Sequence, residues 1–93
     1  MKPELDAIPR LAPGVRLHFR DQQQVLLLMP ERALRLNGPS AEIVRRCDGR
    51  HNVRQIATEL QALYSGSEPQ SILDDLLSYL SLLQERRAMN FDL

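Results

Sequence analysis

The sequence has no tryptophan, only two phenylalanines and two tyrosines, and a single cysteine, Cys47. A lone cysteine cannot form an internal disulfide, so nothing in the chain requires an oxidising compartment. One cysteine with two separated histidines, His18 and His51, does not give the ligand patterns of zinc sites. The four glycines lie far apart, which excludes a glycine-rich phosphate loop. We therefore expect no metal and no cofactor.

The chain also lacks a charge surplus, because twelve basic residues balance twelve acidic ones. A domain that grips phosphates usually carries excess positive charge, so this balance disfavours nucleic acid. No apolar run approaches the roughly 18 residues of a membrane span, and the N-terminus shows no signal-peptide pattern. We therefore expect a cytoplasmic protein. With 93 residues, a single domain has little room for a deep pocket beside its core, which favours a groove or an edge as the binding surface and disfavours an enzyme.

Strand patterns fill the first part of the chain. Residues 1–14 contain three prolines and a glycine and predict an extended N-terminal arm, which leaves 15–93 as a single domain. Alternating apolar residues predict a half-buried strand over 15–20. The continuous apolar run 25–29 is consistent with a strand covered on both faces, and a third short strand follows at about 33–36. The helices, however, can cover only one face of so small a sheet.

Helix signals fill the rest. Asn37 or Ser40 can cap a helix that runs to about Cys47, and Asn52 has the capping-box spacing for a second. A third begins near Pro69, and the residues after 87 form a short strand or a docked tail. This order predicts an α+β fold: a small winged helix-turn-helix-like domain with two to three short antiparallel strands followed by three helices.

The third predicted helix is unusually apolar, since eight of the twelve residues from 72 to 83 are Ile, Leu or Tyr. Seven of the eight cover roughly 160° of the helix wheel, whereas packing within one small domain needs an arc nearer 100°. Leu82 falls outside that arc, beside Asp75. The excess width suggests a second surface for the helix to cover.

Three function classes remain to be weighed. For an enzyme, His18 reads as a solvated strand residue, His51 as a turn residue and Cys47 as a core position. For a DNA-binding regulator, Arg45, Arg46, Arg50 and Arg54 gather near one turn, but Glu68, Asp74 and Asp75 on the last helix would repel phosphates.

Peptide binding is the third class. The third strand offers an edge that could take an extended peptide as an added strand. The groove beside it would be lined by the apolar face of the last helix, and Arg32 and Arg35 could pair with carboxylates of the peptide. A homodimer through the same apolar face explains the composition equally well.

The ordered motifs resemble the PqqD family. Leu27-Leu28-Met29-Pro30-Glu31-Arg32 is similar to its Leu-Leu-x-Pro-Glu signature. The remaining matches follow in the family's order: Leu34, Leu36 and Asn37; Ile43; Cys47-Asp48-Gly49; Val53, Ile56 and Leu60; Asp74 or Asp75; and Tyr79, Leu80 and Leu83. The sequence departs from the family pattern in having Leu76 for Val, Tyr79 for Phe, and no Gly in 86–89.

The resemblance implies a non-catalytic peptide chaperone of pyrroloquinoline quinone (PQQ) biosynthesis, a recognition element for a ribosomal precursor peptide. It would bind the peptide PqqA as a strand and present it to the radical SAM enzyme PqqE. The peptide-binding residues we expect are Arg32, Ala33, Leu34, Arg35 and Leu36 on the third strand and Leu76, Tyr79, Leu80 and Leu83 on the third helix.

Overall fold

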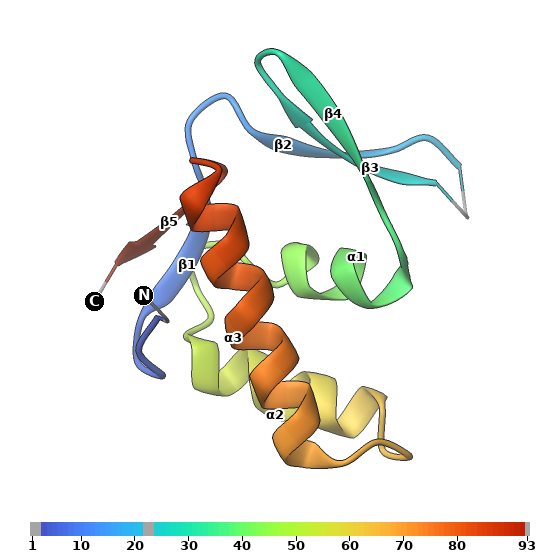
Figure 1. Cartoon of the computed structure of the whole chain (residues 1–93), viewed down its shortest axis with the longest axis vertical. Coiled ribbons are helices and arrows are strands. Elements are labelled where there is room, and N and C mark those ends of the chain that lie inside the picture. The colour runs from blue at the N-terminus through green and yellow to red at the C-terminus, as the bar shows by residue number, and fades with distance from the viewer. Residues whose placement is uncertain (1–2, 22–23, 93) are drawn as a thin grey trace.

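The computed structural model describes residues 3–21 and 24–92 (Figure 1). In these ranges the chain forms two antiparallel sheets and three helices. The elements in chain order are β1 (Ile8–Leu11), β2 (Arg16–Phe19), β3 (Val25–Met29), β4 (Arg32–Leu36), α1 (Gly38–Arg45), α2 (Val53–Leu63), α3 (Pro69–Glu85) and β5 (Met89–Asp92). The predicted α+β class is confirmed, with more strands in the described ranges than the two or three expected. None of the described helices is long and apolar enough to cross a membrane.

The smaller sheet joins the two ends of the chain. β1 lies within the segment expected to be an extended arm, and it pairs with β5 from Ile8 opposite Asp92 to Leu11 opposite Met89. The backbone before β1 is also bonded to the start of α2, where the Val53 amide donates to the Ala7 carbonyl at 2.9 Å. Residues 89–92 are therefore a strand rather than a docked tail, and the N-terminal segment is part of the folded domain.

The larger sheet has the order β2-β3-β4, so β3 lies in the middle (Figure 1). Leu27 at its centre is fully buried, because its side chain points into the core. Leu26 and Leu28 point to the opposite face and are only partly buried. The apolar run alone suggested cover on both faces, but only one face of this strand packs against the core, as expected for so small a sheet.

The helices begin where the caps predict. The Asn37 side chain accepts from the Ser40 amide at 2.9 Å, and Asn52 and Gln55 form a complete capping box. Helix α1 ends at Arg45, two residues before the predicted end at Cys47, but Cys47 still lies in the core.

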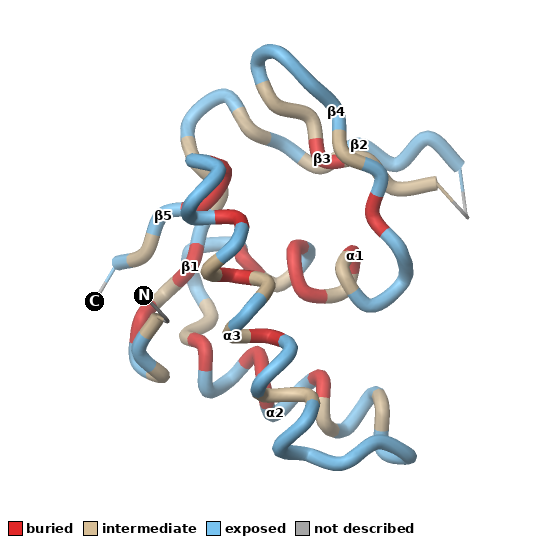
Figure 2. Tube along the Cα trace, in the orientation of Figure 1, coloured by how far each residue is buried: buried red, intermediate tan, exposed pale blue. Residues whose placement is uncertain are grey.

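One face of α3 completes the core. Leu76, Leu80 and Leu83 are fully buried and belong to the same cluster as Leu27 of the sheet and Ile56 of α2. Figure 2 shows buried positions recurring along α3. Full burial of a leucine contributes roughly 1.5–3 kcal/mol. These contacts fix the position of α3 relative to the larger sheet, and through it the geometry described below.

The end of α3 has an unusual backbone. The Ala88 amide donates to the Leu83 carbonyl and the Arg87 amide to the Gln84 carbonyl, both at 2.9 Å, which is a Schellman motif. Such a motif places one residue in the left-handed region, where glycine is preferred. Here that residue is Arg87, with φ of 61°. This is the part of the chain in which the sequence lacks the glycine expected from the PqqD family.

Candidate peptide-binding edge

β4 is an edge strand. Its one partner among the described strands is β3, and no described residue pairs with its other side, which we call the open edge (residues 32–36). β2 forms the opposite edge of the same sheet. An unpaired edge presents backbone donors and acceptors at the spacing that another extended chain requires.

The register shows which backbone groups of β4 bond to β3 and which point away from it. The two-residue turn between β3 and β4 closes on Met29 opposite Arg32, and such a closing pair exchanges both of its hydrogen bonds. Every second pair along the ladder is then hydrogen-bonded as well, so the backbone groups of Leu34 and Leu36 bond to β3. The N–H and C=O groups of Ala33 and Arg35 consequently point away from β3.

The neighbouring strand supports this assignment independently. The Arg20 amide donates to the Gln24 carbonyl at 2.9 Å, which makes these two residues a hydrogen-bonded pair between the ends of β2 and β3. Alternation along β3 then turns Leu26 and Leu28 toward β2 and leaves Leu27 for β4. Both ends of the sheet therefore give the same assignment of residues to hydrogen-bonded and non-hydrogen-bonded pairs.

The side chains of β4 alternate between the two faces. Leu34 and Leu36 point to the core, where Leu36 is buried and Leu34 is partly exposed. Ala33 and Arg35 lie on the opposite, open face and are exposed. The structure thus decides which side of the strand faces the helices, a point that the sequence left open because a shift of one residue would reverse it.

Three residues in the second half of α3 and at its C-cap form what we call the α3 stripe. Tyr79, Leu82 and Arg86 are spaced three and four residues apart, so they share one side of the helix. At one end of the stripe the Tyr79 side chain interacts with Ser40 in the first turn of α1. At the other end Arg86 lines a pocket with Arg32, the first residue of β4. The stripe therefore extends from the first turn of α1 to the pocket at the start of β4.

Tyr79 is half-buried at this position. Burial raises the pKa of its phenol, and the hydrogen bond with Ser40 opposes that rise. Leu82 has 39% of its surface exposed, one of the large apolar side chains that the fold leaves uncovered. The sequence did not single out Leu82 or Arg86 as candidate site residues; the place of Leu82 outside the core arc was the available signal.

The predicted lining needs a correction. Leu76, Leu80 and Leu83 were expected to line the groove, but they have no more than 1% of their surface exposed and form the core instead. They cannot touch a peptide while the domain stays folded. The wide apolar arc of α3 is divided: its centre packs inward, and its flanks carry Tyr79 on one side and Leu77 on the other.

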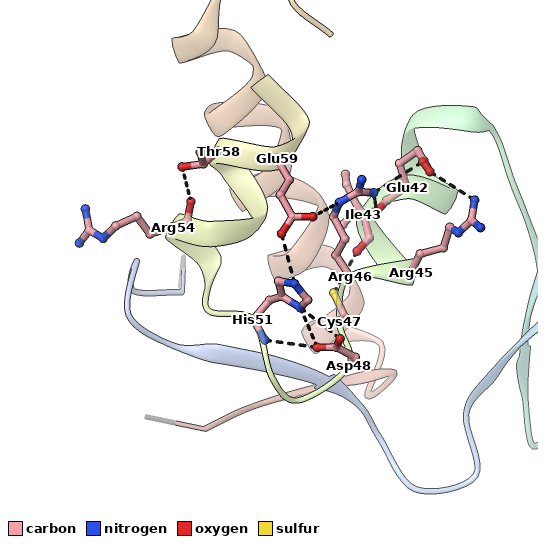
Figure 3. A network of polar contacts seen from close by, with 10 residues as sticks. All are labelled: Glu42, Ile43, Arg45, Arg46, Cys47, Asp48, His51, Arg54, Thr58 and Glu59. Atoms are coloured by element: carbon pink, nitrogen blue, oxygen red, sulfur yellow. Dashed lines mark hydrogen bonds and ion pairs between the residues drawn. The ribbon is translucent and has the colours of Figure 1, made fainter. Parts of the chain in front are cut away.

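The residues weighed for catalysis lie elsewhere. Cys47 is buried, and burial raises the pKa of its thiol to about 12, so it carries no nucleophilic thiolate at neutral pH. His51 in the α1–α2 turn lies 3.0 Å from Asp48 through Nδ1 and 3.2 Å from Glu59 through Nε2 (Figure 3). Among the described residues no cluster of three or more His, Cys, Asp or Glu could hold a metal ion.

The basic residues near the same turn are mostly paired. Arg45 and Arg46 contact Glu42, and Arg46 also contacts Glu59 at 3.1 Å (Figure 3). Arg54 lies 3.4 Å from Asp6. Carboxylates therefore pair with three of the four arginines, which weakens the case for a DNA-binding regulator.

Comparison with known proteins places the chain in a family. The profile of the family described as "Coenzyme PQQ synthesis protein D (PqqD)" matches residues 24–88, which include the open edge and α3. A curated relative from Xanthomonas oryzae pv. oryzae, named "PqqA binding protein", is 35% identical over 85 residues, which are 90% of this chain and 91% of the relative.

A second relative is a fusion. The "Bifunctional coenzyme PQQ synthesis protein C/D" of Methylorubrum extorquens is 36% identical over 83 residues, which cover 88% of this chain and 22% of that protein. A solution NMR structure of the PqqD truncation of Methylobacterium extorquens PqqCD, described as a stand-alone recognition element for ribosomally synthesised peptides, superposes with a TM-score of 0.79 at 34% identity. The superposition covers 97% of this chain and 95% of the PqqD chain in that structure. The chain described here therefore belongs to the PqqD family.

Proposed function

We propose that this protein is a non-catalytic adaptor of PQQ biosynthesis that binds the precursor peptide PqqA as a fourth strand on the open edge. The observation that carries the proposal is the open edge itself, where the backbone groups of Ala33 and Arg35 point away from β3 and no described residue pairs with them. The name of the Xanthomonas relative, "PqqA binding protein", supports the identity of the peptide. A ribosomal peptide is made in the cytoplasm, and we propose that location for the protein.

The energetics favour a moderate affinity. Ala33 and Arg35 offer two donors and two acceptors, and each hydrogen bond contributes only about 1 kcal/mol after water is displaced. About 4 kcal/mol corresponds to a dissociation constant near 1 mM. Apolar contact with Leu82 and the ring of Tyr79 has to supply the rest, at roughly 25 cal/mol per Å², against the cost of ordering the peptide. Such a complex can form and then release its peptide to an enzyme.

We propose roles for the side chains around the open edge. Tyr79 and Leu82 would receive apolar side chains on the face of the peptide that points toward the helices. Leu34 supports that face from within the sheet, and Arg35 on the open face could pair with a carboxylate of the peptide. Leu76, Leu80 and Leu83 act indirectly, because they hold α3 against the core.

Hand-over to an enzyme is the second half of the proposal. We propose the radical SAM enzyme PqqE as the partner that receives the bound peptide. The support is membership of the PqqD family, for which the resemblance in the sequence implies presentation of the peptide to that enzyme. Pull-down of PqqE by the peptide-loaded chain, but not by a variant that cannot bind the peptide, tests this step.

Proline substitutions test the strand model. Proline has no N–H, but an edge position that faces away from its partner strand tolerates it. We expect Ala33→Pro and Arg35→Pro to weaken binding of a synthetic PqqA peptide at least tenfold and to leave the far-UV circular dichroism unchanged. Phe19→Pro is the matched control, because it removes an outward amide from the opposite edge of the same sheet, and it should bind as the wild type does.

Leu34→Pro separates folding from binding. Its amide belongs to the β3–β4 ladder, so the change should destabilise the hairpin itself. Binding that survives proline at both Ala33 and Arg35, in variants that remain folded, would rule out strand addition at β4. Equal loss in Phe19→Pro would place the peptide elsewhere on the sheet.

A further inference from the structure

A pocket of about 540 Å³ lies where the open edge begins, between the β3–β4 turn and the end of α3. Its lining includes three arginines, Arg32, Arg86 and Arg87, and one carboxylate, Glu31. None of the ion pairs found among the described residues involves these three arginines. We refer to this hollow as the arginine pocket.

The charge at the end of α3 has an ordinary explanation that covers only part of the pocket. Cations after the last turn of a helix interact favourably with its exposed carbonyl groups. This accounts for basic residues at 86 and 87, but it does not account for the convergence of Arg32 from another element. It also does not account for arginine at the left-handed position, where glycine would avoid the strain.

Strained backbone is retained at sites where the side chain has a use. Arg87 has φ of 61°, and its side chain lines the pocket rather than the core. Three guanidinium groups, each with a planar fork of donors, match the geometry of a carboxylate. The chemistry of the pocket therefore fits an anionic oxygen group.

The position of the pocket identifies what would carry that group. A strand added antiparallel to β4 runs from the Leu36 end toward the Arg32 end, so the part of the peptide that follows the paired stretch reaches the arginine pocket. We propose that the arginine pocket is a subsite for a carboxylate of the bound peptide, located on the C-terminal side of its paired stretch. This inference rests on the proposed function and adds a specificity determinant to it.

Two sources of a carboxylate are possible, an acidic side chain and the C-terminus of the peptide. We would measure binding of a synthetic PqqA peptide, of versions in which each Asp or Glu is replaced in turn by Asn or Gln, and of the C-terminal amide. The protein variants are Arg32→Gln and Arg86→Gln. Arg50→Gln is the control, since it removes the same charge from an exposed residue in the α1–α2 turn.

We expect Arg86→Gln and Arg32→Gln each to weaken binding of the unmodified peptide by roughly threefold to tenfold, more at low salt than at high salt. One neutralised peptide should bind the wild type with a similar loss and bind Arg86→Gln with no additional loss, because the two changes remove the same contact. Sensitivity to the C-terminal amide would identify the terminus as the source; sensitivity to one Gln or Asn would identify a side chain.

The outcomes separate the two proposals. Suppose that the wild type binds the peptide. The carboxylate subsite is then refuted if Arg32→Gln and Arg86→Gln bind as Arg50→Gln does, or if the binding losses of these variants add to the loss from every neutralised peptide. Strand addition stands in either case. If the wild type does not bind the peptide at all, the proposed function fails and the subsite fails with it.

Discussion

The left-handed backbone of Arg87 allows a quantitative test of the structure. A residue with a Cβ pays about 1–2 kcal/mol to adopt this conformation, whereas glycine adopts it freely. Glycine also gains about 0.5–1 kcal/mol of entropy in the unfolded chain, which opposes the benefit. We therefore expect Arg87→Gly to stabilise the domain by about 0.5–1 kcal/mol. For a domain of this size the midpoint of thermal unfolding should rise by about 2–8 °C.

Arg86→Gly is the matched control. Arg86 is adjacent, equally charged and exposed, but its φ of −88° is ordinary for any residue, so glycine there should destabilise the domain by about 0.5–1 kcal/mol. Urea unfolding of both variants followed by circular dichroism measures the two signs directly. A destabilised Arg87→Gly would refute the Schellman geometry at the end of α3. If the arginine pocket binds a carboxylate, Arg87→Gly should also bind the peptide more weakly, so the variant would exchange function for stability.

Three further predictions follow from buried and paired groups. Cys47 has a thiol pKa raised to about 12 by burial, so alkylation at pH 8 should be slow in the native protein and fast in urea; fast native alkylation would contradict its burial. The pKa of His51 is raised from 6.5 and that of Asp48 is lowered from 3.8, chiefly by their mutual hydrogen bond. The stability that comes from the raised pKa of His51 is fully present below pH 6.5 and is lost as the pH rises through the pKa of the folded state. The stability that comes from the lowered pKa of Asp48 is present above pH 3.8 and is lost as the pH falls through the pKa of the folded state. His51→Asn should therefore cost most between about pH 4 and 6.5, by less than about 1 kcal/mol because both groups are about one-third exposed, and a cost that is the same at pH 8.5 would exclude the charged pair. Leu27→Ala should cost about 2–5 kcal/mol by denaturant unfolding because the side chain is fully buried; a cost below 1 kcal/mol would show that the sheet does not pack as described.

The comparison of expectation with structure separates local signals from long-range ones. The caps at Asn37 and Asn52 and the strand at 25–29 were predicted because side-chain chemistry and periodicity act within a few residues. β1 was read as part of an arm, because its strand character depends on β5, about eighty residues away in the chain, and no local pattern records that pairing. The same limit explains why the apolar run at 25–29 did not show by itself that only one face of the strand packs against the core.

The candidate site shows the same division. The sequence placed peptide binding on β4 and α3, and it did so mainly through the resemblance to the PqqD family. It could not separate the core leucines of α3 from Tyr79 and Leu82, because an apolar arc shows how wide a helix face is but not where the neighbouring elements cover it.

The sequence by itself determined the order of the elements, the helix starts, the core character of Cys47 and the family, since these depend on local chemistry and ordered motifs. Only the tertiary structure decided that the amides of Ala33 and Arg35 point away from β3, because the register with β3 determines which residues of β4 are hydrogen-bonded to it. Only the tertiary structure brought Arg32 close to Arg86 and Arg87, from which it is separated by some fifty residues of chain. It did so because the core contacts of α3 fix where that helix ends relative to the sheet.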